Sequence, residues 1–353
     1  MTRHWKDIPE AVLSLLRRGT VIPAHPLALD AGRKLDPRRQ RALTRYYVDA
    51  GAGGLAVGVH STQFAIREAG LYEPVLRIAM EEARSWTERP LVMIAGLSGR
   101  TAQARKEAGV ARGLGYTACM LSLAPMAGAS VAELIEHCAA VAEEMPLIGF
   151  YLQEAVGGPR LPFEFWRLFA QIDNVVAIKI APFNRYRTLD VIRGLVEARA
   201  EQRVTLYTGN DDHIVLDLAT PFALRRDGED VTVRIKGGLL GHWSAWTRRA
   251  VEHLARIHGA VEANQVTADL IALDARVTDA NSAFFDVANN FAGCIPGCHE
   301  VLRRQGLLEG IWCLNPQETL SPGQAEEIDR VYAAYPDLND DAFVRQNLER
   351  WLA

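Results

Sequence analysis

The sequence predicts an α/β fold, a (β/α)8 TIM barrel with a C-terminal helical appendage. Eight short runs rich in Val, Ile and Leu recur from residue 20 to about residue 258, and amphipathic segments separate them. This alternation is typical of βαβ units with a parallel sheet, and eight such units favour a closed barrel over an open doubly wound sheet. The predicted strands are Thr20–Ala24, Gly54–Val59, Leu91–Ala95, Thr117–Leu121, Leu147–Tyr151, Val175–Ile180, Val204–Tyr207 and Val231–Leu240.

Between these runs, apolar residues repeat at the spacing of one helix face. Thr101 opens one such segment and has a side chain that caps helix N-termini. The stretch Pro221–Val233 is longer than a barrel connection needs, and Arg225-Arg226-Asp227-Gly228 within it is typical of a polar turn, so we expect a surface excursion there. The predicted helices include Pro37–Ala50, Thr101–Leu114, Val131–Glu144 and Phe163–Gln171.

Helical patterns also flank the barrel. A chain of 353 residues accommodates one barrel of about 250 residues and an appendage. We expect an N-terminal helical extension over residues 1–19, the barrel over residues 20–258 and a C-terminal helical region over residues 259–353. In the last region, Leu320-Ser321-Pro322 followed by Glu326 and Glu327 indicates a helix start, because acidic side chains in a first turn complement the helix dipole.

Composition and charge argue against several classes of protein. The chain is 49% hydrophobic and 23% charged, and its net charge is −4 with scattered basic residues, so we expect neither a nucleic-acid nor a membrane partner. No run approaches the roughly 18 apolar residues of a membrane span. The first residues lack the long apolar core of a signal peptide. Five cysteines are an odd set, which fits a reducing compartment. We therefore expect a cytoplasmic protein.

Lys179 is the first candidate for chemistry. It lies inside the apolar run Val175–Ile180, where a lone charge is expensive unless it has a partner. The residue also stands at the C-terminal end of the sixth predicted strand, and active sites of such barrels lie at that end. Burial lowers the pKa of a lysine, and the neutral amine attacks carbonyl carbons. The alternative is a structural ion pair or a lysine at the edge of the barrel.

Two further sets of residues are expected at the same C-terminal end of the predicted barrel. Tyr151 closes the preceding predicted strand, so we expect its hydroxyl near Lys179, where a phenol can relay protons; the alternative is an ordinary core aromatic. Ser61 and Thr62 follow the second strand and offer hydroxyls and backbone amides for a carboxylate. Such a pair is also common in plain turns.

At these residues the sequence resembles the dihydrodipicolinate synthase and N-acetylneuraminate lyase superfamily of Schiff-base-forming barrels. The resemblance runs from about residue 20 to the C-terminus, and Lys179 follows Tyr151 by 28 residues, the separation typical of the family. The stretches that carry it, in order, are Gly51–Val57, Leu91–Gly96 with Thr101, Gly115–Pro125, Phe150-Tyr151 with Gly157-Gly158, Ala177–Lys179, Gly209–Asp211, Gly237–Ser244, Gly306-Leu307 and Asn315–Ser321.

The resemblance implies a class I lyase of the aldolase type that needs no cofactor and no metal. Lys179 would form an imine with the keto carbon of pyruvate or a longer 2-keto acid, and the protonated imine would act as an electron sink. Tyr151 would shuttle protons, Ser61 and Thr62 would hold the carboxylate, and the loop at Gly209 and Asn210 would contact the substrate. Members are commonly homo-oligomers, so we expect one here.

Departures from the family pattern bear on specificity. Members carry a Gly-Thr-Thr-Gly-Glu type of loop, whereas this chain has His60 before Ser61 and lacks the following glycine and glutamate. His60 or Glu154 are alternative acid–base groups. In the lysine-pathway branch an arginine five residues after the tyrosine receives the carboxylate of aspartate semialdehyde, but here that residue is Val156, and Arg160 reaches inward only if its loop folds back. We expect little condensation with aspartate semialdehyde and better activity on hydroxylated aldehydes or their keto acids.

Other signals carry less weight. Cys294–His299 holds two cysteines and a histidine, but the three-residue gap between the cysteines misses the usual zinc spacing, so buried thiols are the preferred interpretation. The glycines at 51, 53 and 54 precede a strand, which is the wrong context for a dinucleotide loop. Asp211-Asp212-His213 mimics a metal cluster, but adjacent acids usually serve a loop. Two alternatives to an aldolase-type lyase stay open: a keto-sugar-acid dehydratase or decarboxylase using the same imine, and a catalytically retired barrel that binds a metabolite.

Overall fold

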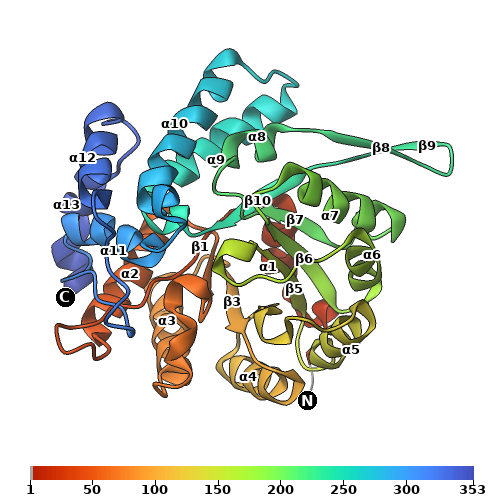
Figure 1. Cartoon of the computed structure of the whole chain (residues 1–353), viewed down its shortest axis with the longest axis horizontal. Helices are drawn as coiled ribbons and strands as arrows, with labels where there is room; N and C mark the ends of the chain where they lie inside the picture. The colour runs from red at the N-terminus through yellow and green to blue at the C-terminus, as the bar shows by residue number, and fades with distance from the viewer. Residues whose placement is uncertain (1–2) are drawn as a thin grey trace.

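The structure, a computed structural model that describes residues 3–353, has eight parallel strands in a nearly closed barrel surrounded by helices (Figure 1). Each of the eight predicted runs overlaps a barrel strand, so the predicted fold is confirmed. The strand order is β1-β10-β7-β6-β5-β4-β3-β2, and one parallel bridge between Ala24 and Ala56 joins β1 to β2. The barrel strands are β1 Val21–Pro23, β2 Gly54–Val57, β3 Val92–Leu97, β4 Ala118–Leu121, β5 Leu147–Leu152, β6 Val175–Ala181, β7 Thr205–Thr208 and β10 Ile235–Leu240.

Helices follow the strands around the barrel and continue beyond it. The barrel helix α9 runs past residue 258 to Glu262, and the C-terminal helices start at Ala268. Residues 1 and 2 of the predicted N-terminal extension lie outside the described residues; the rest of it holds a 3-10 turn, η1 Trp5–Asp7, and α1 Glu10–Arg18. The other helices are α2 Pro37–Ala50, α3 Tyr72–Trp86, α4 Thr101–Leu114, α5 Val131–Ala142, α6 Phe163–Gln171, α7 Arg185–Glu197, α8 Ile214–Ala219, α9 Thr247–Glu262, α10 Ala268–Phe284, α11 Cys294–Arg304, α12 Gln324–Ala334 and α13 Asp341–Leu352.

Capping residues mark the ends of the helices. Helix α2 begins with Pro37 after the Asp36 cap, whose carboxylate accepts from a backbone N–H in the first turn, and it ends at Gly51 in the left-handed conformation. Thr101 is the first residue of α4 and not its cap, which is Arg100. The hydroxyl of Thr101 instead bonds the ring of His137 on α5.

The last predicted strand, Val231–Leu240, is wrong as a single element. The structure divides it into β9 Glu229–Val233, which pairs with β8 Phe222–Arg226 in an antiparallel hairpin, and β10 in the barrel. Asp227 and Gly228 at the tip both have positive φ, the geometry of a two-residue hairpin turn. The hairpin projects from the barrel (Figure 1), as expected for a polar surface excursion.

The N-terminal end of the barrel is closed by α1. Leu13 and Leu16 of this helix pack with side chains of the barrel interior, and the hydroxyl of Tyr207 on β7 donates to the backbone oxygen of Leu16 at 2.8 Å. Full burial of one such leucine contributes roughly 1.5–3 kcal/mol. The interior side chains that α1 meets include Ile22, Ile94, Met120 and Val176. Helix α1 does not cover the other end of the barrel, where the strands have their carboxyl termini.

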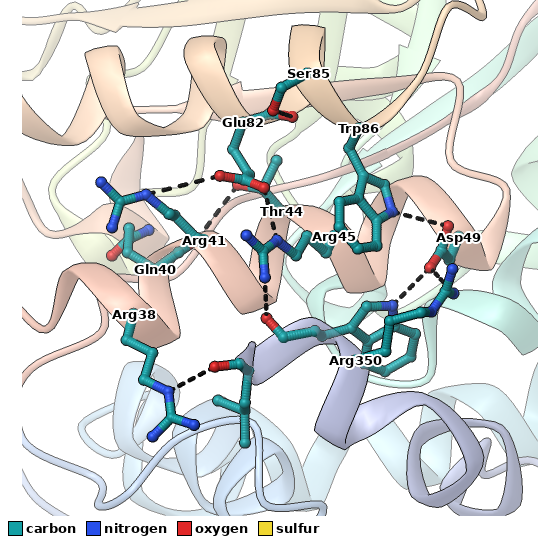
Figure 2. Close-up of polar contacts among 12 residues, drawn as sticks. Arg38, Gln40, Arg41, Thr44, Arg45, Asp49, Glu82, Ser85, Trp86 and Arg350 are labelled. Carbon is teal, nitrogen blue, oxygen red and sulfur yellow. Dashed lines mark hydrogen bonds and ion pairs between the residues drawn. The ribbon is translucent and has the colours of Figure 1, made fainter.

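Hydrogen bonds join α13 of the C-terminal region to the barrel helix α2, which is in turn bonded to α3 (Figure 2). Arg45 on α2 donates to Glu82 on α3 at 2.6 Å and to the backbone oxygen of Trp351 on α13 at 2.8 Å. The two oxygens of Asp49 accept from the indoles of Trp86 and Trp351, at 3.0 and 2.6 Å. This network holds α13 in place and thereby anchors the C-terminal helices. Among the described residues, no helix combines the length and hydropathy that crossing a membrane requires.

Candidate active site

Lys179 lies at the C-terminal end of β6 and points into the barrel mouth. It is only 7% exposed, and in the sheet it stands opposite Phe150 on β5 and Tyr207 on β7. Its amine lies 4.4 Å from the centre of the Phe150 ring. Burial lowers the pKa of Lys179 well below its usual value, although the charge of Asp211 opposes that shift. The residue is therefore a better nucleophile than an exposed lysine, as the sequence indicated.

Gly209 makes room for the lysine stem. A side chain at this position, in the loop after β7, would place its Cβ 2.5 Å from Cε of Lys179 and 2.8 Å from Cβ of Ala181. Both distances are far inside van der Waals contact, so residue 209 must be a glycine for Lys179 to keep this position. Gly209 lines the cavity, as expected of a residue near the substrate, and its backbone N–H is held by the oxygen of Ile180 at 2.7 Å.

A cavity of about 640 Å3, a volume that includes space open to solvent, contains the amine. Its floor comes from the ends of the barrel strands and its roof from the C-terminal region, so the C-terminal helices are part of the site and more than an appendage. Most of the lining is apolar. The residues with polar side chains are His60, Ser61, Gln153, Lys179, Asp211 and His299, and the roof is formed by Phe285, Cys294, Ile295, Cys298 and His299.

Asp211 is a candidate site residue that the sequence interpretation missed. It lies in the loop after β7, is 4% exposed and faces the same cavity as Lys179. One of its oxygens accepts from the backbone N–H of His242 at 3.0 Å, and burial raises the pKa of its carboxyl. Among the described residues Lys179 and Asp211 form no ion pair within 4 Å. The end-of-strand argument that selected Lys179 also applies to Asp211, which was set aside because it adjoins Asp212.

Tyr151 does not reach the cavity, which corrects the expected position of its hydroxyl. The residue is fully buried on the outer face of β5, where its ring packs on Trp166 with 5.3 Å between ring centres. Its hydroxyl oxygen accepts from the backbone N–H of Leu161 at 3.3 Å. Side chains alternate along a strand, and Phe150, not Tyr151, is the inward residue opposite Lys179. A separation of 28 residues along the chain does not determine which face of the strand a residue occupies.

In the loop after β2, some of the candidate side chains line the cavity and one does not. Ser61 and His60 line the cavity, within the 3-10 turn η2 His60–Thr62. Burial lowers the pKa of His60 to about 4, with a contribution from the charge of Lys179, so the imidazole is neutral at neutral pH. The hydroxyl of Thr62 instead accepts from the N–H of Gly58 at 2.9 Å and donates to the oxygen of His25 at 2.6 Å. Thr62 therefore shapes the loop and does not face the cavity.

Gln63 follows in this loop at the position of the missing glycine. It adopts a positive φ of 66°, a conformation that costs a residue with a side chain about 1–2 kcal/mol. Its side-chain oxygen accepts from the backbone N–H of Leu314 at 2.7 Å. The altered loop is thus tied to the C-terminal region, which also supplies the roof of the cavity.

Asn210 positions the loop after β7 and does not line the cavity. Its side-chain oxygen accepts from the N–H of Phe183 at 3.1 Å, and its amide donates to Asp217 at 2.9 Å and to Thr188 at 3.1 Å. The bond to Phe183 connects the loop after β7 to the loop after β6, the strand that carries Lys179. A direct contact with substrate, as expected from the sequence, has no support in this geometry.

A second, outer cavity of about 860 Å3 adjoins the first and shares Gln153 and Phe183 with it. More of its lining residues have polar side chains, and Glu154 pairs with Arg187 at 2.9 Å on one wall. Val156 lines the inner cavity, whereas Arg160 is exposed and lines neither. The remaining polar residues of the outer cavity are Asp212, Thr278, Asn281 and Ser282.

The two cysteines of Cys294–His299 lie on α11 and face the inner cavity. Both are free thiols, and burial raises the pKa of each. Within residues 3–353, no group of three or more His, Cys, Asp and Glu side chains is arranged to hold a metal ion.

Comparison with known proteins places this geometry in a family. Residues 18–220, more than half of the chain, match the model of the dihydrodipicolinate synthetase family. Curated protein sequences give no significant match. Similar solved structures include the chloride-inhibited dihydrodipicolinate synthase from Acinetobacter baumannii complexed with pyruvate, which is 18% identical, with 89% of this chain and 98% of that chain covered and a TM-score of 0.72.

Two further structures extend the likeness. YagE, a prophage protein of the dihydrodipicolinic acid synthase family from E. coli K12 in complex with pyruvate, is 17% identical, with 91% and 98% covered and a TM-score of 0.71. CdNal from Clostridium difficile in complex with mannosamine is 13% identical, with 90% and 99% covered and a TM-score of 0.70. At such identities the likeness shows the fold, whereas the family model covers most of the barrel. The chain belongs to the dihydrodipicolinate synthetase family.

Proposed function

We propose that this chain is a class I lyase that forms an imine between Lys179 and the keto carbon of pyruvate or a longer 2-keto acid. The observation that carries the proposal is a lysine with a lowered pKa at the carboxyl end of a barrel strand, inside a cavity and without an ion-pair partner among the described residues. Two of the similar solved structures are described as complexes with pyruvate, which supports a keto acid as the ligand.

The neutral amine of Lys179 attacks the keto carbon and gives a carbinolamine, which takes up a proton at its hydroxyl and loses water to leave the protonated imine. This cation then accepts the electron pair released when a bond to the adjacent carbon breaks. Asp211 is the group best placed to carry protons, because Phe150 occupies the inward position opposite Lys179 and the hydroxyl of Tyr151 lies outside the cavity. A carboxyl group with a raised pKa can both give and take a proton near neutral pH.

The substrate carboxylate has no arginine to bind in the inner cavity of the described chain. Ser61 and the backbone of η2 therefore remain the proposed carboxylate site, with neutral His60 beside them. The distal part of the substrate extends into the outer cavity, whose polar side chains suit hydroxyl groups. This favours hydroxylated substrates over aspartate semialdehyde, and a keto-sugar-acid dehydratase or decarboxylase that uses the same imine is the second candidate. A cytoplasmic location and a homo-oligomeric state are part of the same proposal.

Exchange of the methyl protons of pyruvate with deuterated water tests this function without knowledge of the second substrate. An imine on Lys179 interconverts with its enamine, and each cycle exchanges one proton at the methyl carbon. We expect the protein to accelerate exchange, followed by NMR, and the Lys179→Ala variant to return it to the uncatalysed rate. A Lys106→Gln variant, changed at an exposed lysine far from the cavity, should behave as the parent. Equal exchange by the parent and the Lys179→Ala variant would contradict the proposal.

A further inference from the structure

A separate cavity lies at the opposite, N-terminal end of the barrel, beside the starts of β7 and β10. Its open volume is about 1,090 Å3. Helix α1 contributes Arg17, the segment that leaves the β8–β9 hairpin contributes Arg234, and β10 contributes Lys236. Figure 1 shows the hairpin leaving the barrel beside these strands. Leu195, Glu201 and Val233 also line it.

The three cations of this cavity have no carboxylate partners in the described chain, which is unusual for a protein with so many paired arginines. Arg17 has its Nε buried without a hydrogen-bond acceptor, and its guanidinium only lies over the ring of Trp5, at 5.4 Å. Arg234 donates to the backbone oxygen of Ala219 at 2.9 Å and makes no ion pair. A partly buried guanidinium without an acceptor is costly, so these donors need a ligand or water.

The single acid of the cavity does not neutralise these cations. Glu201 is paired with Arg226 at 2.9 Å, and Arg226 also donates to the backbone oxygen of Val196 at 2.6 Å. The second oxygen of Glu201 is buried and does not bond Arg17, Arg234 or Lys236. The cavity is therefore lined by two arginines and one lysine that form no ion pair in the described chain.

We propose that this cavity binds the phosphate group of a small molecule. Guanidinium groups bind phosphate through paired, charge-assisted hydrogen bonds, and the ammonium adds a third positive charge. Apolar walls at Leu195 and Val233 leave space for an organic portion, so a phosphate monoester fits better than free phosphate. The site lies at the end of the barrel opposite Lys179, and it does not depend on the proposed imine chemistry.

Isothermal titration calorimetry of the full chain tests the proposal with two probes, inorganic phosphate and glycerol 3-phosphate, at constant ionic strength set with potassium chloride. We expect saturable binding of one molecule per chain, tighter for the monoester, and unchanged in the Lys179→Ala variant, which separates this site from the catalytic mouth. The Lys236→Gln variant removes an exposed ammonium that has no side-chain partner in the described chain, so it should fold normally and bind about threefold more weakly.

The double variant with Arg234→Gln and Lys236→Gln should bind both probes at least roughly tenfold more weakly than the parent. The matched control is Lys106→Gln, which removes the same charge from the exposed face of α4 and should bind as the parent does. Absence of saturable binding of both probes would overturn the proposal. It would also be overturned if the Lys236 and Lys106 variants bound equally well, or if binding disappeared in the Lys179→Ala variant.

Discussion

Replacement of Asp211 by Asn tests whether Asp211 carries protons in the proposed reaction. Asparagine is nearly isosteric and keeps an oxygen that can accept from the backbone N–H of His242, so the loop should hold its position. The change removes a negative charge that faces the same cavity as Lys179. Because no oxygen of Asp211 lies within 4 Å of the amine, the attraction between the two charges is below about 4 kcal/mol at an effective dielectric of 20.

Loss of this attraction lowers the pKa of Lys179 further, because the charge of Asp211 is what opposes the effect of burial. The variant amine should therefore be neutral down to lower pH, and imine formation should persist or extend to more acidic solution. Proton transfer at the methyl carbon of bound pyruvate should slow by roughly 100-fold or more, the usual scale of lost general acid–base catalysis.

The assay combines two measurements on the same protein: borohydride trapping of the imine as a function of pH, and deuterium exchange at the methyl carbon followed by NMR. Retained trapping with slowed exchange is the expected outcome. Exchange at the parent rate in the Asp211→Asn variant would refute the assignment and move the proton transfer to water, His60 or another group.

Three further predictions follow from the contacts around the site. The Tyr151→Phe variant should exchange pyruvate protons within about twofold of the parent and lose about 1 kcal/mol of unfolding free energy, because its hydroxyl only accepts from Leu161; a large fall in exchange would return the catalytic role to Tyr151. The Gly209→Ala variant should fold but lose imine trapping, because its methyl group would displace the stem of Lys179; normal trapping would contradict the packing. Stability should fall as pH decreases from about 6.5 towards 4, since buried neutral histidines have lowered pKa values and the unfolded chain binds protons first, at about 1.4 kcal/mol per pH unit for each histidine. A melting temperature that stays constant between pH 7 and pH 5 would contradict the lowered pKa values of the histidines concerned, which are about 4 for His25, His60, His253 and His299 and about 3 for His242.

The barrel could be predicted from sequence because its signals are local. Apolar runs mark strands that are buried on both faces, and caps such as Asp36 and Gly51 set helix ends, so the predicted bounds of α2, α4 and α6 agree with the structure. The hairpin was missed because the alternation of apolar residues at Val231, Val233 and Ile235 continues from β9 into β10. Only the turn at Asp227 distinguishes a hairpin strand from a barrel strand.

The site could be predicted only in part. Lys179 stands out because a lysine in an apolar strand is rare, and the residue lies where expected. The inward position of Phe150 depends on the phase of β5, which the family spacing to Tyr151 obscured. The roof at Cys294 and Cys298 depends on contacts between α11 and the end of the barrel that carries Lys179. These cysteines follow Lys179 by more than 100 residues in the chain, and local sequence patterns do not encode such distant contacts.

The measurement that tests the central claim most directly is mass spectrometry of peptides after incubation with pyruvate and borohydride. We expect one reduced pyruvyl group per chain, on Lys179, and no labelling of the Lys179→Ala variant. This variant should still fold because the Asp211 carboxyl, whose pKa is raised by burial, can take up a proton when the ammonium is absent. The Lys106→Gln variant should be labelled like the parent. Unmodified Lys179 after treatment with pyruvate and a panel of longer 2-keto acids would contradict the account.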